Sequence, residues 1–166
     1  MKIKGRNFTN RQISKLVESI MLSAAKTAKD SHVRDTHSEA LFAYYETFDT
    51  IQNWSYTYFI KLNINLEKWI RKLESGRVRW SALKTEVEFE DRKYKKYEIE
   101  ELLNRIFYYA KDAVKERKKD KSSFYRQTCI SFTAIIMEMD NWLRAENIPV
   151  NFNLSEWVNN NLIERR

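Results

Sequence analysis

The sequence predicts an all-α protein: an elongated up-down bundle of four main helices with a short fifth helix at the C-terminus. The chain has only two glycines and one proline in 166 residues, whereas β-rich folds need these residues at their many turns. Apolar residues also recur at three- and four-residue steps over long stretches, which is the period of an amphipathic helix. A hydrophobic content of 43% is enough for one packed core. We therefore expect a single helical domain over residues 1–166, which includes a basic N-terminal arm at residues 1–8.

The first helix is expected over residues 9–30. Thr9 and Gln12 have the Thr-x-x-Gln spacing of a capping box, in which each side chain satisfies a free backbone N–H of the first turn. The apolar stripe that follows runs from Ile13 to Ala28. A polar connection then leads to the second helix.

The second helix is expected over residues 36–74, because neither glycine nor proline interrupts this stretch. As one continuous helix it would be roughly 55–60 Å long, at 1.5 Å per residue. A kink near Asn63 is the alternative, and Asn63 or Asn65 would then cap a new, shorter helix beginning at Leu66. Gly76 fits the left-handed position that ends helices.

The third helix is expected over residues 85–118. Thr85 and Glu88 again have the spacing of a capping box. Val87 and Phe89 alternate with acidic residues, which is the period of a strand. A short strand is therefore the alternative at this point, although an isolated strand has little to pair with.

The fourth helix is expected over residues 123–146, and a short last helix near residues 154–163. Proline cannot continue a helix, so Pro149 separates the two. The last helix is expected to dock its apolar side chains, Trp157 among them, on the bundle. Three residues offer an N-cap for the fourth helix: Asp120, Ser122 and Ser123.

Eight aromatic residues lie between residues 42 and 59, where they form two offset stripes on the second helix. A surface helix needs only one apolar stripe. Two stripes indicate either a central helix with a wide core face or a helix with a second face for a partner, because interfaces favour Tyr and Trp. The candidate residues for such a protein interface are Phe42, Tyr45, Trp54, Tyr56 and Phe59.

Catalytic and metal-binding patterns are nearly absent from the sequence. With glycines only at positions 5 and 76, the chain has no glycine-rich phosphate loop and no dinucleotide-binding fingerprint. Cys129, the only cysteine, lies between apolar residues and is expected in the core. His32 and His37 are five residues apart, which does not place both rings on one helical face. We therefore expect no enzymatic activity, no metal site and no cofactor.

Positive charge collects in three parts of the chain, within a net charge of +7. Residues 1–34 carry eight basic and two acidic side chains. Residues 71–84 carry five basic and one acidic side chain, and residues 105–126 carry eight and three. The up-down arrangement places the 71–84 turn beside the N-terminal arm and the 115–121 run at the other end. Cations in last turns also stabilise the helix dipole, which is the structural alternative for part of this set. The candidate contacts for nucleic acid or another anion are Arg71, Lys72, Arg77, Arg79, Trp80, Lys115, Lys118, Lys119 and Lys121.

The sequence predicts a non-enzymatic helical protein that acts by assembly, as an adaptor or subunit in an oligomer or a larger complex. The alternative is a nucleic-acid-binding accessory protein that contacts phosphates through the basic ends of the bundle. No small-molecule substrate is indicated. No stretch reaches the roughly 20 apolar residues of a membrane span, and the N-terminus lacks the apolar region of a signal peptide, so we expect a cytoplasmic protein.

Overall fold

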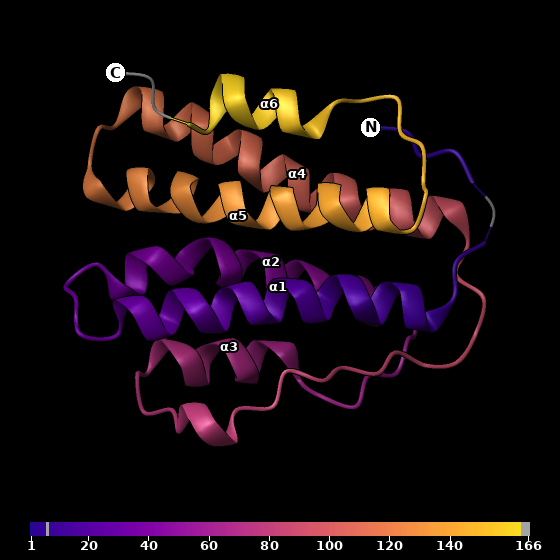
Figure 1. Ribbon diagram of the computed structural model, residues 1–166, viewed down its shortest axis with the longest axis horizontal. Coiled ribbons are helices and arrows are strands. Elements are labelled where there is room, and N and C mark those ends of the chain that lie inside the picture. Colours follow the sequence, from indigo (N-terminus) through magenta and orange to yellow (C-terminus); the bar gives the residue numbers. More distant parts are fainter. Residues whose placement is uncertain (6, 164–166) are drawn as a thin grey trace.

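The protein is built from helices that run back and forth along one long axis (Figure 1). The structure is a computed structural model that describes residues 1–5 and 7–163, and in this part of the chain it holds six α-helices and one 3-10 turn. The all-α prediction is confirmed. The elements are α1 (Asn10–Ser31), α2 (His37–Thr57), α3 (Leu66–Glu74), the 3-10 turn η1 (Trp80–Ala82), α4 (Lys96–Lys119), α5 (Ser123–Ala145) and α6 (Leu154–Asn161).

The helices form layers in Figure 1, with α3 outermost on one side, α1 and α2 next, then α4 and α5, and α6 outermost on the other side. The first helix begins as predicted. The Thr9 hydroxyl accepts a hydrogen bond from the Gln12 N–H (3.2 Å), and the Gln12 side chain accepts one from the Thr9 N–H (2.9 Å). Among the residues that the structure describes, no helix combines the length and apolar character needed to cross a bilayer.

Helix α2 lies at the centre of the bundle, where it contacts α1, α3, α4 and α5. This position explains its two aromatic stripes, because a helix surrounded by neighbours buries side chains on more than one face. Tyr44, Phe48 and Trp54 are all fully buried. Trp54, a candidate interface residue, therefore lies in the core and is not accessible to a partner in this structure.

The second predicted helix, 36–74, is interrupted, so the prediction of one continuous helix is wrong. Helix α2 ends at Thr57 and α3 begins at Leu66. The alternative is confirmed, because the Asn65 side chain caps α3 by accepting a hydrogen bond from the Lys68 N–H (3.0 Å). The chain reverses over residues 58–65 and α3 runs back along α2. The bundle is consequently shorter than two unbroken long helices would make it.

The predicted helix start at Thr85 is also wrong, because α4 begins only at Lys96. Residues 83–95 are mostly extended, and Val87 and Phe89 are buried while the alternating Glu86 and Glu88 are exposed. The segment is extended, as the strand alternative expects, but within the described residues it pairs with the 58–65 reversal only through an isolated bridge, Leu62 with Phe89, and forms no strand. Two backbone hydrogen bonds join the segments, from the Asn63 N–H to the Glu88 carbonyl (3.3 Å) and from the Glu90 N–H to the Lys61 carbonyl (2.9 Å).

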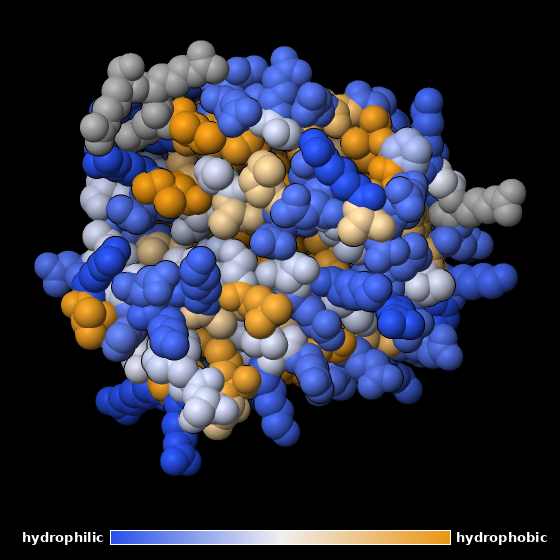
Figure 2. Space-filling view, in the orientation of Figure 1, coloured by the Kyte–Doolittle hydropathy of each residue, from blue (hydrophilic) through white to orange (hydrophobic). Residues whose placement is uncertain are grey.

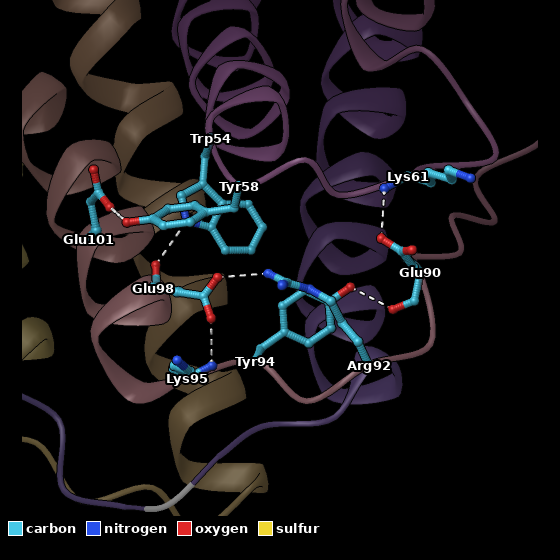
Figure 3. A network of polar contacts seen from close by, with 9 residues as sticks. All are labelled: Trp54, Tyr58, Lys61, Glu90, Arg92, Tyr94, Lys95, Glu98 and Glu101. Carbon is cyan, nitrogen blue, oxygen red and sulfur yellow. Dashed lines mark hydrogen bonds and ion pairs between the residues drawn. The ribbon is translucent and has the colours of Figure 1, made fainter.

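A polar network fixes this extended segment to α2 and α4 (Figure 3). Trp54 donates its indole N–H to the Glu98 carbonyl (2.8 Å), and Tyr94 stacks on the Trp54 ring (6.3 Å between centroids). The Glu98 carboxylate, only 3% exposed, accepts hydrogen bonds from the Arg92 guanidinium (2.7 Å) and from the Lys95 N–H (2.8 Å). The network therefore holds three separate parts of the chain together with charge-assisted bonds.

The N-terminal arm packs against the bundle at the end where α1 begins. Ile3 and Phe8 are buried. The Lys4 N–H donates to the Pro149 carbonyl (2.7 Å), and the Phe8 N–H donates to the Tyr94 carbonyl (2.7 Å). The arginine of this arm, Arg6, lies outside the described residues.

Candidate functional site

The fold brings both predicted basic clusters to the same end of the bundle, which corrects the prediction of opposite ends. The cause is the reversal at 58–65, which returns α3 toward the α1–α2 turn. At this end the His32 ring lies 6.1 Å from the Trp80 ring, and the Ser123 hydroxyl donates to the Glu39 carboxylate (2.8 Å). The start of α5 therefore contacts the start of α2, and the 71–80 turn contacts the end of α1 on the other side of the α1–α2 layer.

We call this end of the molecule the basic end. It comprises the 71–80 turn, the α1–α2 turn and residues 111–126. Residues 71–80 carry four basic and one acidic side chain, and residues 111–126 carry seven and three. In Figure 2 hydrophilic side chains project from this end, which lies on the left of the view. An excess of one sign of charge on one surface attracts ligands of the opposite sign.

The 71–80 turn presents two arginines to solvent. Gly76, at φ 70°, ends α3 in the left-handed conformation that glycine adopts without strain. Arg77 and Arg79 follow it and are exposed, and neither guanidinium has a hydrogen bond or ion pair within the described residues. Trp80 is half-buried and packs against the core. The two arginines are thus available to a ligand.

Arg71 and Lys72 differ from these arginines because they still belong to α3. The Arg71 guanidinium donates to the Tyr45 hydroxyl (3.4 Å) and pairs with the Glu67 carboxylate (2.8 Å). These two groups, Tyr45 first, raise the pKa of Arg71. Lys72 is exposed in the last turn of α3, where a cation stabilises the helix dipole.

The second cluster lies where α4 ends. Lys119 is 3.9 Å from the Glu116 carboxylate, and Lys121 is exposed in the α4–α5 turn. Arg117 points elsewhere, since its guanidinium donates to the carbonyls of Asn161 (2.6 Å) and Leu162 (2.9 Å) at the C-terminus of α6. That arginine has a structural role, because it satisfies free carbonyls at the negative end of a helix.

Lys115 and Lys118 line a groove of about 440 Å³ between α4 and α6. Sequence reasoning missed the remaining members of this groove, which include Tyr108, Lys111 and Trp157. The spacing of the lysines in the sequence could have predicted that they lie together, because positions 111, 115 and 118 share one face of a helix. No local pattern indicated that α6 would place a tryptophan opposite them.

A second groove, of about 230 Å³, lies between α2 and α4. One acidic and one basic side chain line it, Asp49 and Arg105. Burial, reinforced by the charges of Asp112 and Asp49, raises the pKa of nearby Glu46 to about 7. The groove on the α6 side of α4, with its three lysines, is the one suited to a negatively charged ligand.

The candidate interface residues separate into three groups. Trp54 is buried, as described above. Phe42 and Tyr45 are half-buried, with Phe42 packed on Phe124 at 4.8 Å between ring centroids. Tyr56 is 60% and Phe59 is 90% exposed. Only the last two present much apolar surface to solvent.

Phe59 is unusual in its backbone as well as its exposure. It adopts φ 55°, which is uncommon for a residue other than glycine and is enriched in asparagine. The conformation follows from the reversal, because the Ile60 N–H donates to the Ser55 carbonyl (2.8 Å) and ends α2. Tyr97, which is 56% exposed, also belongs to this end of the molecule. We call Tyr56, Phe59 and Tyr97 the aromatic patch.

The two histidines take part in local structure. The His37 Nδ1 lies 3.0 Å from the Ser31 hydroxyl and its Nε2 lies 3.2 Å from the Leu73 carbonyl, so this ring links α1, α2 and α3. His32 contacts the carbonyl of Lys29 (2.7 Å). Within the described ranges, no group of three or more His, Cys, Asp or Glu residues is arranged to hold a metal ion.

Comparison with known proteins finds no matching family model, no similar curated protein and no similar solved structure.

Proposed function

We propose that the protein binds nucleic acid through its basic end. One observation carries the proposal: two basic segments that are far apart in the sequence lie at one end of the fold, and four of their exposed cations, Arg77, Arg79, Lys115 and Lys118, have no acidic partner within the described residues. Lys and Arg side chains neutralise phosphates and release condensed counterions, which supplies sequence-independent affinity. The class of ligand is therefore a polyanion with regularly spaced phosphates.

Structural roles account for only part of this charge. Arg71, Lys72 and Arg117 stabilise helix ends or pair with neighbours. Arg77 and Arg79 lie beyond the end of α3, and the dipole effect is confined to the last turn of a helix. These two guanidinium groups have no partner within the described structure, so no contact inside the fold explains them. Binding of phosphate groups would explain them.

A charge-reversal experiment tests the proposal. We expect Arg77→Glu with Arg79→Glu to weaken binding of a labelled oligonucleotide about tenfold or more at low salt, because two phosphate contacts become repulsions. The slope of log affinity against log salt concentration should also fall by about 2, one for each lost contact. Fluorescence anisotropy over a salt series measures both quantities.

The matched control is Lys4→Glu with Lys93→Glu. These lysines are exposed, lie at the opposite end of the bundle and change the net charge by the same amount. We expect this control to bind nearly as the natural chain does. The proposal is abandoned if the natural chain does not bind at low salt, or if both double variants lose the same affinity.

We propose self-association through the aromatic patch as a second function. The observation in its favour is Phe59, a large apolar side chain that is 90% exposed at a strained backbone position. Exposed apolar groups that gather on one surface mark interaction sites. A second copy of the chain is the partner that requires no further component, and a two-fold interface places the same patch on both subunits.

Light scattering coupled to size exclusion tests this second proposal. We expect the natural chain to form a dimer and Phe59→Asn to be monomeric, because asparagine removes the ring while tolerating the positive φ. Val33→Asn is the control, since Val33 is 81% exposed on the α1–α2 turn at the other end. A natural chain that remains monomeric across concentrations contradicts the proposal.

A further inference from the structure

We infer that the groove between α4 and α6 binds an unpaired stretch of nucleic acid, with phosphates on its lysines and bases against its aromatic rings. The inference rests on the proposed nucleic-acid binding and specifies the form of the ligand. It assigns roles to Tyr108 and Trp157, which lie outside the basic end, and a specific role to Lys111. The occupant is single-stranded, because only unpaired bases offer their faces to a protein.

The lysines provide a row of positive charge along one wall. Lys111, Lys115 and Lys118 follow one face of α4 over about 10 Å, at 1.5 Å per residue. All three are exposed, and none forms an ion pair within the described residues. Lys111 also lies over the Phe107 ring, with its Nζ 4.9 Å from the centroid, which fixes the stem of that side chain. A row of this kind suits a chain of phosphates better than one isolated anion.

The acidic residue of the groove does not cancel this row. Asp112 also lines the groove, but its charge acts on Glu46, across the α2–α4 side of the helix. Three lysines and one carboxylate therefore line the groove. The net charge of the lining is positive.

The aromatic side chains provide surfaces for bases. Trp157 packs edge-on against Phe107 (4.6 Å between centroids, 67° between ring planes), and Phe107 also contacts Phe152 (5.3 Å). These contacts hold the indole in place while it remains half-buried at the groove. Tyr108 lines the same groove from α4 and is 60% exposed. Base–aromatic stacking of this kind is tolerant of sequence.

The size and position of the groove favour a single strand over a duplex or an acidic protein. A volume of about 440 Å³ falls within the roughly 300–1,000 Å³ of sites that enclose small ligands. A duplex keeps its bases stacked and presents only edges and backbone. Lys118 continues into Lys119 and Lys121, so a strand leaving the groove passes directly onto the basic end. An acidic peptide has no nucleobases that could stack on the rings of Tyr108 and Trp157.

The first test compares three probes with the same protein. They are an oligothymidine of about 12 nucleotides, within the usual site size, an abasic strand of equal length and charge, and the corresponding duplex. We expect oligothymidine to bind about tenfold more tightly than the abasic strand, which corresponds to one stacked base. Tyr108→Ala should remove this preference. Tyr109→Ala is the control, because Tyr109 is the next residue and lines the α2–α4 groove but not the α4–α6 groove, whereas Tyr108 lines both.

The second test reverses charge in the groove. We expect Lys115→Glu with Lys118→Glu to weaken oligothymidine binding more than Lys4→Glu with Lys93→Glu, and to weaken duplex binding less than single-strand binding. If oligothymidine and the abasic strand bind alike, or if polyglutamate of equal charge competes as well as oligothymidine, the groove inference is wrong while the basic-end proposal stands. If no probe binds at low salt, both are wrong.

Discussion

Replacing Trp54 with alanine is expected to lower the free energy of unfolding by about 3–5 kcal/mol, the usual cost of removing a large buried aromatic ring. Trp54 is fully buried and lies near the Tyr58, Phe89 and Tyr94 rings, at 6.0, 6.3 and 6.3 Å between centroids. Its loss leaves a cavity where α2, the extended segment and α4 meet, and removes the hydrogen bond to the Glu98 carbonyl. Urea unfolding followed by circular dichroism measures the effect.

The free energy of unfolding of an ordinary domain is only about 5–15 kcal/mol, so Trp54→Ala could leave too little folded protein to measure. Two further variants therefore test the same prediction. Trp54→Phe retains most of the ring volume and is expected to cost about 1–2 kcal/mol, much of it the lost hydrogen bond. Trp80→Ala is the matched control, because Trp80 is only half-buried in η1 and should cost under about 1.5 kcal/mol. Equal losses at Trp54 and Trp80 would contradict the central position of Trp54.

Replacing Glu98 with alanine is expected to cost about 2–4 kcal/mol, because it breaks a largely buried ion pair and leaves Arg92 without its carboxylate. One Arg92 nitrogen, Nε, is already buried with no hydrogen-bond partner in the described structure. The Lys95 N–H at the start of α4 loses its acceptor in the same variant. The expected loss for Glu98→Ala is smaller than the loss for a fully buried ion pair. The Arg92 side chain is 33% exposed, so water around the guanidinium screens its charge.

The matched control for this network is Glu116→Ala, near the other end of the same helix. Glu116 pairs with Lys119 at 3.9 Å, and both side chains are more exposed than Glu98. An exposed pair of this kind contributes at most about 1 kcal/mol. Thermal or urea unfolding that ranks Glu116→Ala at or above Glu98→Ala would show that the network in Figure 3 does not stabilise the fold.

A neighbouring contact in the same region joins α2 to α4. The Tyr58 hydroxyl donates to the Glu101 carboxylate, and this hydrogen bond, aided by burial, raises the pKa of Tyr58 to about 12. Glu101 also pairs with Arg105 one turn later. The end of α2 is therefore connected to α4 through both aromatic packing and charge, which positions the reversal that follows.

The sequence by itself determined where a helix begins or ends when that end depends only on residues close to it in the chain. The capping box at Thr9 and the Asn65 cap form as their spacing predicts, and Gly76 ends α3. These features were predictable because each involves groups only a few residues apart, so no knowledge of the rest of the fold is needed. The composition determined the all-α class for a similar reason, since few residues suited to tight turns were present.

Only the tertiary structure decided which local patterns are used and where the charges meet. The capping pattern at Thr85 is not used, because Val87 and Phe89 are buried when the segment is extended and paired with the 58–65 reversal. The same reversal returns α3 toward the α1–α2 turn and so places the two basic clusters at one end of the bundle. Contacts between residues far apart in the chain determine these outcomes, and the free energy of burying apolar surface exceeds that of a single cap.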